Sequence, residues 1–178
     1  MLLDTGSQIK AHTIWLTGLP SAGKTTIGRA LVDRLRSESI AAELLDGDEV
    51  RAKLAPELGF SRADRDENVR RIGFVANLLS RNGVTAVCSV ISPFRSIRDE
   101  LRAVHGDRFL EVWISTPVDV CASRDVKGLY ARQRAGEIQG LTGVDDPYEA
   151  PLQAEVVIPT QQLTVSDAVS VIFTALQS

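Results

Sequence analysis

A glycine-framed loop between an apolar run and a helical pattern constrains the fold of this chain most. Residues 18–25 read GLPSAGKT and match the spacing G-x-x-x-x-G-K-[ST] of a phosphate-binding loop. Residues 13–17 before it are apolar and rich in β-forming types, which predicts a buried strand. Apolar side chains then recur at helical spacing over residues 24–37. A strand, a glycine loop and a helix in this order predict a site that binds a polyphosphate.

The residue types of this loop explain how it would bind phosphate. Glycines let backbone N–H groups turn inward, and the N-terminus of the following helix adds partial positive charge. Lys24 is expected to reach the β- and γ-phosphates, and the Thr25 hydroxyl to ligate Mg²⁺. A chance glycine loop with a surface lysine is the alternative, which the flanking strand and helix disfavour. The residues predicted to bind the phosphates are Gly18, Leu19, Pro20, Ser21, Ala22, Gly23, Lys24, Thr25 and Thr26.

Composition limits the classes of function that are open to the chain. Its 178 residues suit one domain, expected over residues 12–178 after an N-terminal tail of residues 1–11. The net charge of −3 gives no reason to expect nucleic-acid binding, and the apolar runs are too short to span a membrane. Residues 1–10 lack the pattern of a signal peptide, and Cys88 and Cys121 form no disulfide framework. A cytoplasmic protein is expected.

Strands alternate with helices along the chain, which predicts an α/β fold with a parallel, doubly wound sheet of five strands in three layers. The candidate site residues follow the ends of strands, where such sheets bind their ligands. Residues 125–151 break the rhythm with glycines and charges, and an insertion of this length over a phosphate site predicts a mobile lid. Strands are expected over residues 13–17, 40–45, 84–91, 109–115 and 155–158, and helices over residues 24–37, 61–82, 95–104, 117–124 and 166–175.

Two carboxylates, Asp46 and Asp48, follow the second predicted strand. Phosphoryl transfer needs a metal ion on the phosphates and a group that orients or deprotonates the acceptor hydroxyl, and two carboxylates can divide these tasks. The structural alternative is an acidic turn that caps a short helix. Arg51, three residues on, is either an anion contact or a solvated helix arginine. No N-K-x-D guanine-binding signature is evident, which argues against a GTPase.

Residues 60–68 combine aromatic, basic and amide side chains at the start of a long predicted helix. Arg65 and Asn68 share a helix face, where arginine offers a fork for an anion and asparagine can bind a base or sugar edge. Phe60 either stacks on a base or fills the core, and residue physics leaves both readings open. Ser92, which follows the most apolar strand, either bonds a substrate phosphate or caps the next helix.

Taken together, these motifs resemble the adenylylsulfate (APS) kinase family. The resemblance rests on residues 18–26, 45–51, 58–71, 91–95 and 124–151, and it covers the chain from about residue 12 to residue 159. It implies a P-loop kinase fold, commonly a homodimer, and transfer of a phosphoryl group from ATP to the 3′-hydroxyl of APS with Mg²⁺, in sulfate activation. It also raises a functional pairing with ATP sulfurylase.

The same resemblance implies a role for individual positions. Asp46 is expected to be the base and Asp48 to join Thr25 at Mg²⁺, while Arg124 lies near the ATP adenine. Ser92 matches the phosphoserine position proposed for the family, although in-line transfer needs no covalent step. The residues expected to bind APS are Asp46, Arg51, Phe60, Arg65, Asn68, Ile91, Ser92, Lys127 and Leu141.

Two positions depart from the family pattern. Glu49 stands where asparagine is common, and Leu141 stands where phenylalanine often precedes a Thr-Gly pair. An apolar Leu141 wall predicts weaker APS binding, because stacking on an aromatic side chain is worth ~1–3 kcal/mol per base. Another small-acceptor P-loop kinase is the nearest alternative function, and a catalytically silent module that binds the product nucleotide is the second. The intact phosphate-binding loop disfavours the silent module.

Overall fold

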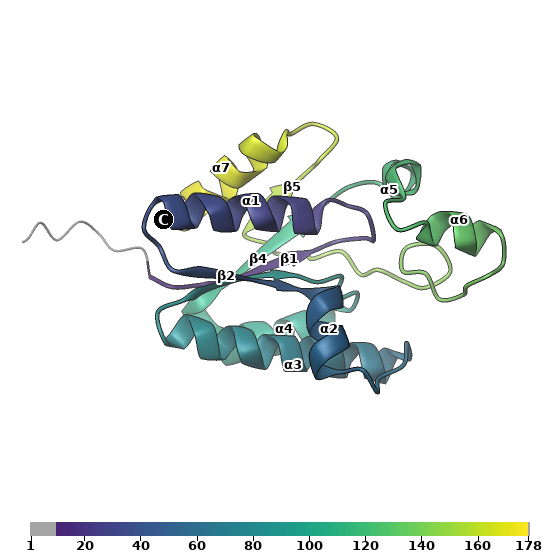
Figure 1. The fold of residues 1–178 in the computed structure, drawn as a ribbon, viewed down its shortest axis with the longest axis horizontal. Coiled ribbons are helices and arrows are strands. Elements are labelled where there is room, and N and C mark those ends of the chain that lie inside the picture. Colours follow the sequence, from purple (N-terminus) through teal and green to yellow (C-terminus); the bar gives the residue numbers. More distant parts are fainter. Residues whose placement is uncertain (1–9, 178) are drawn as a thin grey trace, which may run out of the picture.

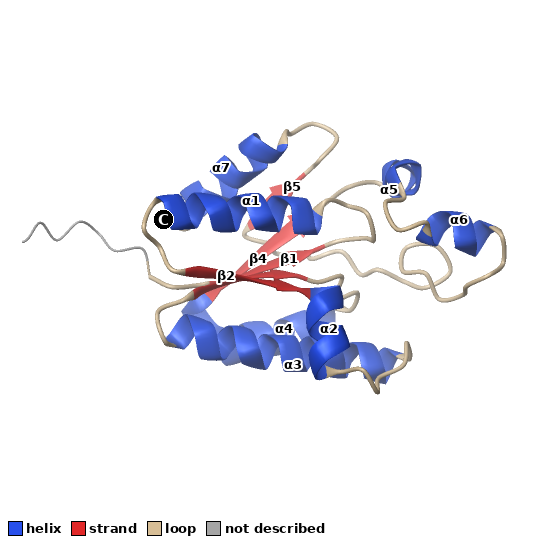
Figure 2. Ribbon diagram, viewed as in Figure 1, coloured by secondary structure: helices blue, strands red, loops and turns tan. Residues whose placement is uncertain are grey.

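The computed structural model describes residues 10–177, so most of the predicted N-terminal tail lies outside the described residues. Strands and helices alternate along the chain (Figure 2). The strands are β1 (Thr13–Thr17), β2 (Ala42–Asp46), β3 (Thr85–Ser89), β4 (Phe109–Ile114) and β5 (Val156–Ile158). The helices are α1 (Lys24–Ser37), α2 (Gly47–Leu54), α3 (Arg62–Arg81), α4 (Arg95–His105), the short 3₁₀ turn η1 (Gly106–Arg108), α5 (Val118–Arg124), α6 (Leu129–Arg134) and α7 (Val165–Ala175).

The five strands form one sheet in the order β2-β3-β1-β4-β5, and every neighbouring pair is parallel. Helices α1 and α7 cover one face of the sheet, and α3 and α4 cover the other (Figure 1). The predicted three-layer, doubly wound parallel sheet is therefore confirmed. Within residues 10–177, no helix is both long and apolar enough to cross a membrane.

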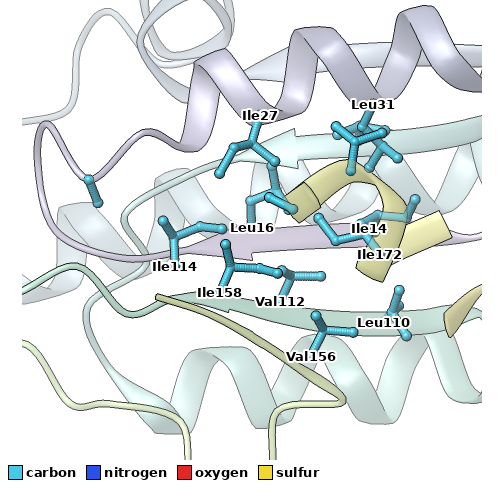
Figure 3. Close-up of a cluster of buried hydrophobic side chains, with 14 of the residues drawn as sticks. Ile14, Leu16, Ile27, Leu31, Leu110, Val112, Ile114, Val156, Ile158 and Ile172 are labelled. Carbon is cyan, nitrogen blue, oxygen red and sulfur yellow. The ribbon is translucent and has the colours of Figure 1, made fainter. Parts of the chain in front are cut away.

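Alternation along β1 sends side chains into two separate cores, because successive residues of a strand point to opposite faces. Ile14 and Leu16 pack with Ile27 and Leu31 of α1 and with Ile172 of α7 (Figure 3). Between them in the sequence, the Trp15 side chain enters the opposite core, which lies under α3 and α4. All five residues of β1 are buried, as expected for a central strand that is covered on both faces.

Helix α2, directly after β2, is the short capped helix that was the structural alternative for Asp46 and Asp48, whereas the short helix α6 within residues 125–151 was not predicted. Helix α2 has no buried residue, so it carries no apolar periodicity from which it could be recognised. Asp46 caps it, since the Asp46 side chain accepts hydrogen bonds from the backbone N–H groups of Asp48 and Glu49. Helix α3 begins as predicted after Ser61, whose hydroxyl accepts from the backbone N–H of Asp64 at 3.1 Å.

Three short helices belong to neither of the two helix layers, and they lie together at one end of the molecule. Helices α2, α5 and α6 lie near the start of α1, at the right of the view in Figure 1. This is the end toward which the parallel strands run, so the loops that follow the strands meet there. The fold thus brings segments that are distant in sequence to one edge of the sheet.

Candidate active site

A cavity of about 1040 Å³ lies at the carboxyl ends of the strands. Its lining combines the loop after β1, the start of α2, the region around the start of α3, the segment after β3 and residues 124–142. Every residue predicted to bind a substrate lines it except Gly18 and Leu19. The predicted residues that line it are Pro20, Ser21, Ala22, Gly23, Lys24, Thr25, Thr26, Asp46, Asp48, Arg51, Phe60, Arg65, Asn68, Ile91, Ser92, Arg124, Lys127 and Leu141.

The loop after β1 has a backbone geometry that requires glycine at positions 18 and 23. A Cβ at Gly18 would lie 2.6 Å from the carbonyl oxygen of Ile114, so no side chain fits there. Gly23 has φ of 109° and lies at the N-terminus of α1, a left-handed conformation that glycine adopts at no steric cost. Both glycines shape the loop, although only Gly23 lines the cavity.

The Lys24 side chain is buried inside this loop. Its ammonium group donates hydrogen bonds to the carbonyl oxygens of Gly18 at 3.0 Å and Leu19 at 2.7 Å. Burial lowers the pKa of Lys24 to about 7, since a desolvated ammonium group is disfavoured. A polyphosphate in the loop would supply negative charge and favour the charged form again.

Thr25, the first-turn residue of α1, meets the end of β2. Its hydroxyl donates to Oδ2 of Asp46 at 2.7 Å and lies 3.0 Å from the Ser89 hydroxyl. The other Asp46 oxygen accepts from the backbone N–H of Asp48 at 3.0 Å. Asp48 itself is 70% exposed and pairs with the ammonium group of Lys127. The structure therefore brings Asp46 to Thr25, and Asp48 to Lys127, which also lines the cavity.

Phe60 and Arg51 contact each other, and both line the cavity. The Phe60 side chain is 76% exposed, so it does not fill the core. The Arg51 guanidinium lies 4.8 Å from the centre of the Phe60 ring and donates to the carbonyl oxygen of Leu58 at 2.8 Å. Asn68, in the second turn of α3, is buried and lines the cavity.

Ser92 neither caps α4 nor presents a free hydroxyl. The residue that precedes α4 is Phe94, which makes no side-chain cap, so the capping alternative is wrong. The Ser92 hydroxyl is 1% exposed, accepts a hydrogen bond from Trp15 Nε1 at 2.9 Å and donates to Thr17 Oγ1 at 3.1 Å. Thr17 in turn donates to the carbonyl oxygen of Ile91 at 2.7 Å. Ser92 thus fixes the end of β3 to the core below the cavity.

The part of the cavity around Arg124 is lined by one predicted residue and by several residues that the sequence analysis did not single out. Arg124, which was predicted, donates to the carbonyl oxygen of Ala22 at 3.1 Å and to Thr160 Oγ1 at 2.9 Å. The unpredicted lining residues here are Thr160, Leu163, Thr164 and Val165. They follow β5 in an uncharged, glycine-free stretch, and their place after a predicted strand was the available signal.

Residues 125–151, which we call the lid segment, contact the phosphate-binding loop and β1. The Tyr130 hydroxyl donates to the carbonyl oxygen of Pro20 at 3.0 Å, and the Tyr148 hydroxyl lies 2.9 Å from Thr17 Oγ1. Arg132 and a run of unpredicted residues over positions 138–140 also line the cavity. The lid segment therefore forms one wall of the site.

The fold and the cavity together define a P-loop kinase. The family model described as adenylylsulphate kinase matches residues 10–159. The chain belongs to the adenylylsulphate kinase family, a family of phosphotransferases, and the resemblance drawn from its motifs is confirmed.

Individual relatives agree with this membership. The adenylyl-sulfate kinase of Rippkaea orientalis is 56% identical over 165 residues, which cover 93% of this chain and 91% of the relative. The structure of the Mycobacterium tuberculosis APS kinase CysC in complex with AMPPNP and APS has a TM-score of 0.90 at 37% identity, covering 95% of this chain and 99% of that one. A hexameric APS kinase from Thiobacillus denitrificans has a TM-score of 0.70 at 36% identity, covering 95% of this chain and 29% of that one.

Proposed function

We propose that this chain transfers the γ-phosphoryl group of ATP to the 3′-hydroxyl of adenosine 5′-phosphosulfate, giving 3′-phospho-APS. One observation carries the proposal. Lys24 and Thr25 of the phosphate-binding loop line the same cavity as Asp48, Phe60 and the other residues matched to APS binding. An assay of ADP release with APS as acceptor tests it. ATP turnover with another small acceptor and none with APS would overturn it.

The donor half of the cavity suits ATP. The backbone N–H groups of Ser21, Gly23 and Lys24, at the start of α1, favour the phosphates, and the Lys24 side chain adds a positive charge once it is protonated. Arg124 and Thr160, which are hydrogen-bonded to each other, form the end assigned to the adenine. Gly18 and Leu19 act through the shape of the loop rather than by contact.

The donors beside the phosphate-binding loop fit Mg²⁺. Thr25 and Asp46 supply oxygen atoms, which Mg²⁺ prefers, and Mg²⁺ is usually bound by one or two protein groups with phosphates and waters completing its shell. Among residues 10–177, no cluster of three or more His, Cys, Asp or Glu forms a cage made by the protein alone, which agrees with this shared mode of binding. Mg²⁺ supplies charge neutralisation on the transferring phosphate.

We assign the acceptor hydroxyl to Asp48 and the metal side to Asp46, the reverse of the division expected from sequence. Asp46 already accepts hydrogen bonds from the Thr25 hydroxyl and from the backbone of Asp48 and Glu49. Asp48 has an exposed carboxylate, and its partner Lys127 is itself matched to phosphate binding. A carboxylate that is free of the backbone is better placed to orient or deprotonate an incoming hydroxyl.

The acceptor half suits a nucleotide with an anionic tail. Phe60 offers an exposed ring and Leu141 an apolar side chain for the base, while Arg51 supplies positive charge beside them. Ile91 and Asn68 complete the lining. Ser92 acts by positioning the end of β3, since its buried hydroxyl is bonded to Trp15 and Thr17.

The remaining expectations concern the setting of the enzyme. A homodimer and a functional pairing with ATP sulfurylase are proposed from the family resemblance, and a cytoplasmic location is proposed from the composition of the sequence. Light scattering on the purified protein, with and without added ATP sulfurylase, tests the first two. A monomer at micromolar concentration would overturn the homodimer.

A further inference from the structure

Two adjacent carboxylates of the lid segment, Asp145 and Asp146, have different partners. The two Asp145 side-chain oxygens accept hydrogen bonds from the backbone N–H groups of Gly140 at 2.8 Å and Leu141 at 2.6 Å. These backbone hydrogen bonds, that from Gly140 foremost, hold the pKa of Asp145 below its usual value. Asp145 therefore closes the turn over residues 140–146 from within.

Asp146 instead joins this turn to α3. Its Oδ2 lies 2.7 Å from Nη2 of Arg65, a side chain that is only 13% exposed. The same guanidinium donates to the Gly140 carbonyl at 2.7 Å and to Thr142 Oγ1 at 2.7 Å. Arg65, a residue of α3, thus contacts the turn through three of its residues.

Arg65 also fixes the segment that carries Phe60. Its Nε donates to the carbonyl oxygen of Phe60 at 2.9 Å. A guanidinium has five N–H donors, so this bond and the three to the turn leave one N–H for a ligand. Arg65 is therefore occupied mainly with the protein and cannot offer a two-pronged contact to an anion while this arrangement lasts.

Arg65 joins the two segments that carry Phe60 and Leu141, the apolar side chains of the acceptor half of the cavity. Leu141 lies within the turn and Phe60 lies just before α3, and both line the cavity. One guanidinium bonds the backbone at Phe60 and the backbone at Gly140, next to Leu141. The separation between the two apolar side chains therefore depends on where Arg65 is held.

We propose that Asp146 is a positioning residue, which holds Arg65 so that the turn over residues 140–146 stays docked on α3 and keeps Leu141 and Phe60 at the spacing that a purine base requires. This inference rests on the proposed function for the identity of the acceptor. The docking itself is a property of the protein without substrate and can be measured separately.

The test uses Asp146→Asn, which keeps the shape of the side chain and removes its charge. Loss of one charge-assisted hydrogen bond in a partly buried site should raise KM for APS by about tenfold, with KM for ATP nearly unchanged. Without any substrate, trypsin should cut the exposed lid arginines Arg132 and Arg134 faster in this variant, since cleavage follows the population of the open state. The thermal midpoint should change little.

Glu100→Gln is the matched control. It removes a carboxylate from the ion pair with Arg70, at 2.8 Å on the outer surface of α3 and α4, and should leave both measurements as in the wild type. Unchanged trypsin cleavage and unchanged KM for APS in Asp146→Asn would overturn the proposal, and so would an equal rise in KM for both substrates. Faster cleavage in a protein that does not use APS would support the docking role while refuting the proposed acceptor.

Discussion

The Thr25 hydroxyl donates a hydrogen bond to the Asp46 carboxylate at 2.7 Å, which joins the phosphate-binding loop to the carboxyl end of β2. The contact exists because β2 ends at Asp46 and α1 begins next to Thr25, both at the same edge of the sheet. This contact is the reason for proposing Asp46 on the metal side of the site, and Asp48, which is 70% exposed, as the carboxylate for the acceptor.

Replacing Asp48 by asparagine should therefore affect a different kinetic quantity from replacing Asp46 by asparagine. For Asp48→Asn we expect kcat to fall by about 10²–10⁴-fold, the usual contribution of an acid–base group, with KM for ATP little changed. For Asp46→Asn the main expected effect is a higher Mg²⁺ concentration at half-maximal rate, because a negative charge beside Thr25 is lost. Initial rates across an Mg²⁺ titration measure both effects.

Thr25→Ser is the control for this pair, since it keeps the hydroxyl and should retain the wild-type Mg²⁺ dependence. Near-normal turnover in Asp48→Asn, together with loss of turnover at saturating Mg²⁺ in Asp46→Asn, would return the base to Asp46.

Ser92→Ala separates a structural role of Ser92 from a covalent one. The indole N–H of Trp15 would lose its acceptor in the core, so we expect the free energy of unfolding to fall by about 1–3 kcal/mol. Turnover should persist, because in-line transfer needs no enzyme-bound phosphoryl group. Urea unfolding and steady-state rates measure the two effects. A folded but inactive variant, or wild-type protein labelled by γ-labelled ATP alone, would contradict this assignment.

Leu141→Phe should strengthen APS binding. The side chain at this position lines the cavity, and an aromatic ring there would add a stacking surface worth ~1–3 kcal/mol. Leu141 also packs in the core with α1, so part of the gain is offset by crowding, and we expect a decrease in KM for APS of about five- to tenfold. Leu141→Met, which changes volume little, is the control. An unchanged or raised KM for APS in Leu141→Phe would mean that the base lies elsewhere.

Sequence reasoning pointed to residues around the cavity where a spacing rule or the end of a strand marked them. The loop over residues 18–26 follows from glycine spacing, and Asp46 and Asp48 follow from their place after an apolar strand. The parallel sheet follows from the alternation of strands and helices. These features are local in the sequence, so a single chain suffices to predict them.

Contacts between distant segments could not be predicted in the same way. Arg98 of α4 is 1% exposed and pairs with Glu111 of β4 at 2.8 Å, and it also bonds the backbone of Ser92 and Glu149. Nothing in the pattern around Arg98 distinguishes it from a solvated helix arginine. The role of Ser92 was equally hidden, because its partner Trp15 lies 77 residues away.

The buried His105 at the end of α4 should make the protein sensitive to acid. Its side chain is 2% exposed and lies 5.4 Å from the Phe109 ring, and burial lowers its pKa below the usual histidine value of 6.5. As pH falls below about 6.5, the unfolded chain binds a proton that the folded chain does not. The free energy of unfolding then decreases, by at most about 1.4 kcal/mol per pH unit, until the pH reaches the folded-state pKa.

Urea unfolding of the wild type and two variants checks this expectation. It is measured at about pH 7.5, 6.5 and 5.5, which lie around the pKa of a histidine in an unfolded chain. His105→Leu keeps an apolar group in place and should flatten the pH dependence. His12→Gln removes the only other histidine, whose pKa burial also lowers, and it measures that share separately. Carboxylates titrate in all three proteins, so the difference between wild type and variant isolates each imidazole. An identical slope in His105→Leu would mean that His105 gains its proton as easily in the folded chain as in the unfolded one.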